Sequence, residues 1–192
     1  MHASFQQIYQ RTITQQGYQA DPAQAETVNQ LEQLYQHLHR TNEPQTRWRR
    51  AFWRAPSPRG IYIWGPVGRG KTFLMDLFFA HIPNGCGIRL HFHRFMARLH
   101  CELTAEQGHR EPLERIASRL AKECRVICFD EFYLNDIGDV MLLGRLLEAL
   151  FNKGVILIAT SNRPPAELCR DSLYQDRVQP LIKLLLQPLL VT

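Results

Sequence analysis

The apolar and polar residues between positions 61 and 168 follow two periods, which predict strands and helices in alternation. Short continuous apolar runs indicate strands buried on both faces, whereas the run IRLHFHRF alternates apolar with polar residues. The alternating order indicates an α/β fold, a parallel sheet with helices on both faces. The predicted strands are 61–64, 88–95, 126–129 and 155–159, and the predicted helices are 71–81, 96–107, a segment opened by Pro112, 138–152 and a segment after Pro164-Pro165.

The residues before position 61 divide into a helical segment and a linker. Within 21–40, Asp21 is suited to cap a helix and Pro22 to its first turn, and the following apolar residues recur on one helical face. Residues 1–20 are polar and rich in glutamine, and they predict no particular element. We therefore expect an N-terminal helical segment (1–43), a linker (44–60) and a core domain (61–192).

The linker, PQTRWRRAFWRAPSPRG, has three prolines and a closing glycine, and its five arginines between Arg47 and Arg59 are interleaved with Trp48, Phe52 and Trp53. Basic residues alternating with aromatic ones can bind single-stranded nucleic acid or an anionic membrane surface. The alternative is a solvated linker whose aromatic side chains pack on the domain. The formal net charge of +5 is compatible with both interpretations.

The composition indicates a globular protein. Of the 192 residues, 45% are hydrophobic and 21% are charged, which favours one domain with a sizeable core. The first residues lack the basic and apolar regions of a secretory signal, and no apolar run approaches the ~18 residues of a transmembrane helix. We therefore expect a cytoplasmic protein.

Cysteine and histidine positions do not indicate a metal site. The five cysteines are odd in number and include no C-x-x-C pair, which argues against a disulfide framework and a zinc site. Cys128 falls in an apolar strand and is expected to be a buried thiol. His91 and His93 are expected to share one face of the strand at 88–95. Without ligand partners at suitable spacing, we interpret them as core or sheet-face residues.

A phosphate-binding pattern lies between the strand at 61–64 and the helix at 71–81. The segment GPVGRGKT fits G-x-x-x-x-G-K-[ST], in which glycines let backbone N–H groups surround phosphate oxygens beside a helix N-terminus. Lys71 is expected to reach the β- and γ-phosphates, and the Thr72 hydroxyl to bind Mg²⁺. Arg69 either touches phosphate or fills a variable position. The expected nucleotide-binding residues are Gly65, Pro66, Val67, Gly68, Arg69, Gly70, Lys71 and Thr72.

An acidic pair follows the apolar strand at 126–129, in the sequence VICFDEF. Ligands bind at the carboxyl ends of strands in open α/β sheets, so we expect Asp130 to support Mg²⁺ and Glu131 to act as catalytic base. The alternative is an ordinary surface turn. The chain between Lys71 and Asp130 has room for one added strand, which with the Asp-Glu pair indicates ATP rather than GTP as substrate. No N-K-x-D guanine signature occurs.

A polar residue follows the fourth predicted strand, in VILIATSN. Asn162 is expected to bind the γ-phosphate or to orient the attacking water, and this is the sensor position of ring-forming AAA+ ATPases. The alternative is a turn residue, the usual role of an asparagine after a strand.

Several long segments together resemble the ZapE family of AAA+ ATPases, bacterial cell-division proteins with mitochondrial relatives. They are the N-terminal helix, GIYIWGPVGRGKTFLMDLFF, RLHFHRFM and ICFDEFYLNDIGDVMLLGRLLEALFNKGVILIATSNRPPAEL, between about residues 21 and 168. The resemblance implies an ATPase that uses ATP and Mg²⁺ and associates with itself. It also implies a cytoplasmic role, peripheral at the division site, on the tubulin-like protein FtsZ. Lys71, Glu131 and Asn162 match the family's catalytic positions, and Asp136 and Asp139 are interpreted as helix caps or interface residues.

The chain departs from the family pattern after Leu168. The family continues with a G-L-Q-R-x-R-F-L-P-like segment, whereas this chain has SLYQDRVQPLI, in which Arg177 alone aligns with a basic residue. Arg177 is therefore the candidate arginine finger. Family members continue through a fifth strand and a helical lid, both expected to be missing here. Residues 184–191 could imitate part of that strand, confined by Pro188 to a sheet edge.

Two alternatives to an active ATPase stay open. The altered segment after Leu168 is also compatible with a catalytically inert nucleotide-binding or interaction fragment. The arginine- and tryptophan-rich linker is compatible with a nucleic-acid-associated AAA+ ATPase of the helicase-loader type.

Overall fold

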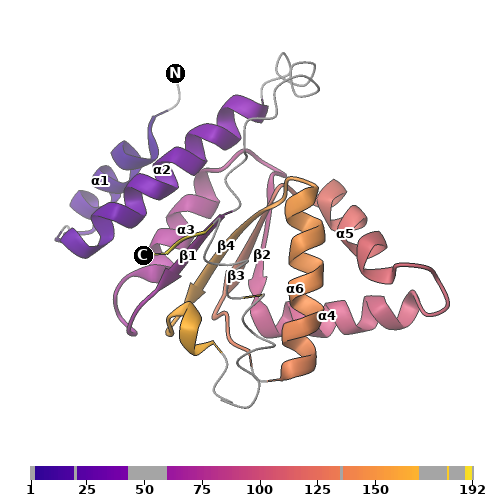
Figure 1. Ribbon diagram of the computed structural model, residues 1–192. Coiled ribbons are helices and arrows are strands. Elements are labelled where there is room, and N and C mark those ends of the chain that lie inside the picture. Colours follow the sequence, from indigo (N-terminus) through magenta and orange to yellow (C-terminus); the bar gives the residue numbers. More distant parts are fainter. Residues whose placement is uncertain are drawn as a thin grey trace.

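The computed structural model describes residues 3–19, 21–42, 60–134, 136–168, 181 and 189–191. Its centre is a five-stranded parallel sheet in the order β2-β3-β4-β1-β5, with helices on both faces (Figure 1). The predicted α/β fold is therefore confirmed. The strands are β1 (Gly60–Trp64), β2 (Gly87–His91), β3 (Val126–Asp130), β4 (Ile156–Ser161) and β5 (Leu189–Val191). The helices are α1 (Phe5–Gln15), α2 (Pro22–Asn42), α3 (Lys71–His81), α4 (Phe92–Ala105), α5 (Pro112–Glu123) and α6 (Ile137–Asn152), with a 3₁₀ turn at Pro165–Glu167.

Side-chain alternation in the central strands separates two hydrophobic cores. In β3, Val126 and Cys128 pack with α1, α2 and α3, whereas Ile127 and Phe129 pack with α4, α5 and α6. We call these sides the α3 face and the α6 face. Because both are covered, the central strands have continuous apolar sequences, as predicted. Cys128 is fully buried, which confirms the prediction of a buried thiol, and burial raises its pKa.

Helices α1 and α2 form an antiparallel hairpin that belongs to the core of the α3 face (Figure 1). The predicted helix at 21–40 is confirmed as α2, whereas the sequence predicted no element for α1. Ser4 and Gln7 form a reciprocal capping box at the start of α1. Phe5 is fully buried and meets the ring of Phe78 edge-on, with centroids 5.7 Å apart. The hairpin is thus anchored to α3, the helix that follows the phosphate-binding pattern.

The strand predicted at 88–95 is wrong beyond His91. The chain enters α4 at Phe92, and the buried residues Phe92, Phe95, Met96 and Leu99 have helical spacing. Phe92 continues the alternation of Ile88 and Leu90 and also begins the helical spacing, so the pattern does not mark where the strand ends. The prediction that His91 and His93 share a strand face is therefore wrong. His91 ends β2, and His93 lies in the first turn of α4, where the two rings stack at 5.7 Å.

The order of strands in space differs from their order in the chain. β2 precedes β3 in sequence but lies at the sheet edge, and β4 is the strand that separates β1 from β3. At the opposite edge, Leu189–Val191 pairs in parallel with β1. The expected absence of a fifth strand is therefore wrong for these three residues. The edge position predicted for 184–191 is confirmed for 189–191, and residues 184–188 lie outside the described residues.

Two sequence predictions lie outside the described residues: the linker at 44–60, apart from Gly60, which begins β1, and the arginine-finger candidate Arg177. The segment after Pro164-Pro165 forms a short 3₁₀ turn rather than a longer helix within the described residues. Asp136 accepts hydrogen bonds from the N–H groups of Gly138 and Asp139, which confirms it as a helix cap. In the part of the chain that the structure describes, no helix is both long and apolar enough to span a membrane.

Replacing Phe5 with Ala should reduce the free energy of unfolding by about 3 kcal/mol, because it removes a fully buried ring from the shared core. Urea denaturation followed by circular dichroism measures this change. Met141→Ala is the matched control, since Met141 is 53% exposed on α6 and its truncation should change stability by less than about 0.5 kcal/mol. Similar small losses for both variants would show that α1 is not part of the cooperative core.

Candidate nucleotide-binding site

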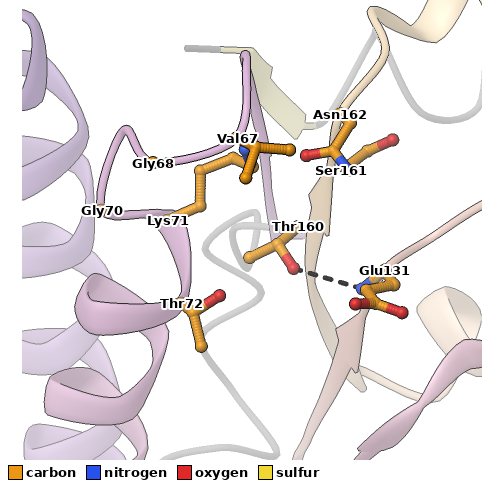
Figure 2. Close-up of a pocket in the computed structure, with 9 residues that line it drawn as sticks. All are labelled: Val67, Gly68, Gly70, Lys71, Thr72, Glu131, Thr160, Ser161 and Asn162. Atoms are coloured by element: carbon orange, nitrogen blue, oxygen red, sulfur yellow. Dashed lines mark hydrogen bonds between the residues drawn. The ribbon is translucent and has the colours of Figure 1, made fainter.

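The parallel pairing of β1 with β4 brings two polar segments to one edge of the sheet. Trp64 pairs with Ser161, and one residue further the N–H of Gly65 donates to the carbonyl of Ser161 at 3.2 Å. A cavity of about 390 Å³ opens between the two segments (Figure 2). It is lined by Val67, Gly68, Gly70, Lys71, Thr72, Glu131, Thr160, Ser161 and Asn162.

The backbone of the phosphate-binding loop, residues 65–72, has the form that its glycines permit. Gly68 and Gly70 are left-handed, with φ of +85° and +79°, and a side chain at either position would be strained. Gly70 is also the N-cap of α3 and supplies no capping side chain. The N-terminal N–H groups of α3 therefore face the cavity together with the positive end of the helix dipole, an arrangement that binds anions.

Lys71 and Thr72 lie in the first turn of α3, beside the cavity (Figure 2). The ammonium of Lys71 donates to the carbonyls of Gly65 at 2.6 Å and Pro66 at 2.8 Å, so it lies across the bend of the loop. Partial burial lowers the pKa of Lys71. The loop therefore holds a cation among backbone donors, which is the charge pattern that a polyphosphate requires.

Glu131 faces the same cavity from the opposite side, because the chain turns sharply after β3. It adopts a left-handed conformation with φ of +55°, which is unfavourable for a non-glycine residue. The turn is held by β4: the N–H of Glu131 donates to Thr160 Oγ1 at 3.4 Å, and the N–H of Phe132 donates to the Thr160 carbonyl at 2.8 Å. Strained residues of this kind concentrate at functional sites.

Asp130 points elsewhere, onto the α3 face. Its carboxylate accepts two hydrogen bonds from Arg89 of β2, at 2.7 and 3.1 Å, and Arg89 also binds Asp76 of α3. Burial opposes the charge of Arg89, but the hydrogen bonds that it donates to both carboxylates raise its pKa overall. Asp76 lies one turn after Thr72, so the Thr72 hydroxyl belongs to the side of α3 that approaches Asp130.

The residue types of Thr72 and Asp130 suit a magnesium ion held together with phosphate, although Asp130 is paired with Arg89 and does not line the cavity. Among the described residues, no cluster of three or more His, Cys, Asp or Glu side chains could hold a metal by itself. Mg²⁺ needs only one or two protein oxygens when phosphates and water supply the rest. Thr72 and Asp130 are oxygen donors of this kind, and the role predicted for Asp130 stays a prediction.

Asn162 lies just after β4, exposed and lining the cavity, on the side opposite Lys71 (Figure 2). The hydroxyl of Ser161 donates to the Phe132 carbonyl at 2.9 Å and accepts from the N–H of Arg163 at 3.2 Å. These bonds fix the turn that carries Asn162. A neighbouring cavity of about 490 Å³ shares Glu131, Ser161 and Asn162 and also contacts His93.

Four residues at the site were not predicted from the sequence. Thr160 and Ser161 hold the turns around Glu131 and Asn162, and the only signal for them was their place at a strand tip. Arg89 is the first residue of the segment RLHFHRFM. The pattern of that segment is distinctive, but it does not indicate the contact of Arg89 with Asp130. Gln24, in α2, donates to the carbonyl of Arg69 at 3.0 Å, a contact that no local pattern indicates.

Arg69 is in contact with the N-terminal hairpin, and the two roles considered for it from the sequence stay predictions. Its guanidinium forms an ion pair with Asp21 at 3.5 Å, so its side chain points to the N-terminal hairpin. Both side chains are partly exposed, and such pairs contribute little stability. The pair nevertheless shows that the start of α2 lies against the loop.

Comparisons with known proteins agree with this geometry. The family model "AFG1-like ATPase" matches residues 3–191. The cell division protein ZapE of Escherichia coli K12 is 47% identical over 186 residues, which cover 91% of this chain and 50% of the relative. The chain thus spans about half the length of this curated relative.

Solved structures show the same fold at low sequence identity. Domain III of the Thermotoga maritima replication initiation protein DnaA matches with a TM-score of 0.56 at 15% identity, covering 90% of this chain and 62% of that one. The DnaC helicase loader matches with a TM-score of 0.56 at 15% identity, covering 91% of each chain. These matches show a shared fold, and they confirm the predicted phosphate-loop fold with its parallel sheet.

The left-handed conformation of Glu131 predicts that replacement by glycine leaves the protein more stable than replacement by alanine, the reverse of the usual order. Glu131→Gly should be about 1 kcal/mol more stable than Glu131→Ala, because glycine alone adopts this conformation without strain. At an ordinary exposed position, alanine is the better tolerated of the two. Thermal or urea unfolding of both variants measures the difference, and a more stable alanine variant would contradict the strain.

Proposed function

The chain belongs to the AFG1-like ATPase family, and from this premise we propose that it binds ATP with Mg²⁺ and hydrolyses it. One observation carries the proposal. The cation-bearing loop at Gly65–Thr72 and the acidic residue Glu131 line opposite sides of one cavity. The loop suits the binding of a polyphosphate, and Glu131 suits the activation of the water that attacks the terminal phosphate.

In this proposal, the backbone of the loop and the N-terminus of α3 bind the phosphates. The loop contributes Gly65, Pro66, Val67, Gly68, Arg69 and Gly70 through its backbone, of which Pro66 lacks an N–H. Lys71 exchanges its two carbonyl contacts for the β- and γ-phosphates, which are stronger partners for an ammonium. Thr72 and Asp130 hold Mg²⁺, which would neutralise charge that develops on the phosphates.

Hydrolysis is assigned to the residues across the cavity. Glu131 accepts a proton from the attacking water while the water oxygen forms a bond to the γ-phosphorus and the bond to the ADP oxygen breaks. The fixed turn at Thr160 keeps the carboxylate in place during this transfer. Asn162 orients the water or binds the γ-phosphate. Arg177, outside the described residues, is the candidate finger for a neighbouring subunit's nucleotide.

We further propose that the whole protein acts in cell division. Its support is the 47% identity to a relative named as a cell division protein, of which this chain spans half. The proposed setting is the cytoplasm, peripherally at the division site, where homo-oligomers act on an FtsZ-type protein. This assignment is separate from the nucleotide chemistry and needs its own test.

The nucleotide chemistry is tested by comparing the chain with two single variants. Saturating Mg²⁺-ATP should raise the melting temperature of the parent chain and of Glu131→Gln, because binding stabilises the folded state by mass action. Lys71→Ala should abolish this shift. Phosphate release should be lost in both variants. A parent chain that shows the shift but releases phosphate no faster than Glu131→Gln would establish the inert nucleotide-binding alternative instead.

The division assignment predicts that the chain cosediments with FtsZ filaments and that Mg²⁺-ATP changes the bound fraction. Lys71→Ala should remove the effect of ATP. Single-stranded DNA is the comparison ligand. Retention on DNA that weakens steeply with salt, together with no binding to filaments, would favour the helicase-loader alternative.

A further inference from the structure

An aromatic corner lies beside the phosphate-binding loop. Phe73 follows Thr72 directly, and its ring meets Tyr18 edge-on at 6.0 Å and lies 6.3 Å from Tyr9. Tyr9 is buried, whereas Tyr18 is 59% exposed in the turn between α1 and α2. Such an exposed ring, held by other rings next to a phosphate site, is a surface on which a flat heterocycle can stack.

Exposed large hydrophobic side chains are uncommon in the part of the chain that the structure describes. The large hydrophobic side chains that are exposed among the described residues are Tyr18, Trp64, Val67 and Met141. Trp64 and Val67 belong to the strand end and loop of the phosphate site itself. Tyr18 is far from that loop in sequence but reaches it through Phe73. Apolar surface is therefore gathered around the loop.

The polarity of the site sets the direction in which a bound nucleotide would extend. Water attacks the terminal phosphate, and Glu131 and Asn162, which face that end, lie on the side of β3 and β4 (Figure 2). The remainder of the nucleotide then extends away from them. The hairpin packs on α3, the helix in which Phe73 directly follows Thr72 (Figure 1).

Gln24 supplies a polar edge at the same place. Its amide N–H₂ donates to the carbonyl of Arg69 at 3.0 Å, and its amide oxygen accepts the hydroxyl of Tyr9 at 3.0 Å. The approach is so close that a Cβ on Gly70 would lie 2.5 Å from the amide nitrogen. A glutamine amide has two donors and two acceptor positions. These two bonds use one of each.

The remaining donor and acceptor match one base. Adenine offers an acceptor at N7 and a donor at N6, and a glutamine amide pairs with both at once. Guanine offers two acceptors, N7 and O6, on the same edge, and a single remaining donor satisfies only one of them. The amide of Gln24 therefore has the hydrogen-bonding pattern that distinguishes adenine from guanine.

We propose that Tyr18 and Phe73 stack the nucleotide base and that Gln24 selects adenine, an inference that rests on the proposed binding of ATP. The hairpin of α1 and α2 is then part of the nucleotide site. The phosphate loop supplies affinity for any polyphosphate, and the hairpin supplies the preference for the base.

Titration calorimetry on the full chain tests the stacking step, with Mg²⁺-ATP and magnesium tripolyphosphate as ligands. Tyr18→Ala should raise the dissociation constant for ATP about tenfold, a typical loss for one base–aromatic stack, and leave that for tripolyphosphate unchanged. Tyr18→Phe keeps the ring and should restore the affinity. Met141→Ala, which removes an exposed side chain on α6, is the control.

The selection step is measured as the ratio of the dissociation constants for GTP and ATP. Gln24→Ala should bring this ratio close to one. A loosened loop would weaken both nucleotides and tripolyphosphate together without changing the ratio, so a purely structural role is separable. That pattern would overturn the assignment of Gln24.

The titrations distinguish failure of the base subsite from failure of the proposed ATP binding. Equal affinities of the parent chain for ATP and tripolyphosphate, or unchanged ATP affinity in Tyr18→Ala, would overturn the base subsite alone. A parent chain that binds neither ligand would overturn both proposals. Loss of both ligands in Lys71→Ala would confirm that the titrated site is the phosphate loop.

Discussion

The parallel pairing of β1 with β4 is the constraint on which the candidate site depends. The register that joins Trp64 to Ser161 makes the two strands end together, and the bond from Gly65 to Ser161 continues the pairing into the loop. Parallel strands of a sheet present their carboxyl ends at one edge. The phosphate-binding residues and the polar tip of β4 therefore meet across a cavity although about ninety residues separate them in the chain.

The same strand gives two adjacent carboxylates different environments. Alternation along β3 directs Asp130 to the α3 face, where Arg89 neutralises it and links it to α3. Thr160 of β4 then holds the left-handed turn that directs Glu131 into the cavity. A partly buried, paired carboxylate suits the support of a metal ion, and an exposed carboxylate suits the transfer of a proton from water. The strained backbone of Glu131 thus gives the two neighbouring carboxylates different surroundings and different proposed roles.

The N-terminal hairpin contributes to both stability and the site. Phe5 of α1 packs against Phe78 of α3, so the hairpin completes the hydrophobic core that supports the loop. At its turn, Asp21 and Gln24 contact Arg69, which lies in that loop. An element that looked like a separate segment in the sequence is therefore packed against the nucleotide-binding residues.

The sequence by itself determined the features that neighbouring residues specify. Apolar runs identified β1, β3 and β4, the glycine pattern identified the loop, and the order of strands and helices indicated the parallel sheet. Gly68 and Gly70 show why this works, since their backbone conformation is a property of the residue itself. The positions of Lys71, Glu131 and Asn162 at strand and helix ends followed from the same local patterns.

Only the tertiary structure decided what depends on contacts between distant segments. The end of β2 at His91 was settled by the packing of Phe92 and Phe95 in the α6-face core, because Phe92 fits both the alternation of the strand and the spacing of the helix. The partners of Asp130 and of Arg69 come from β2 and α2, and no pattern within a segment encodes which distant side chain will reach it. Local sequence fixes the backbone preference of each segment and the polarity of each face of its helix or strand. Which side chains from distant segments come into contact is fixed by the order of strands in the sheet and by the helices packed on it.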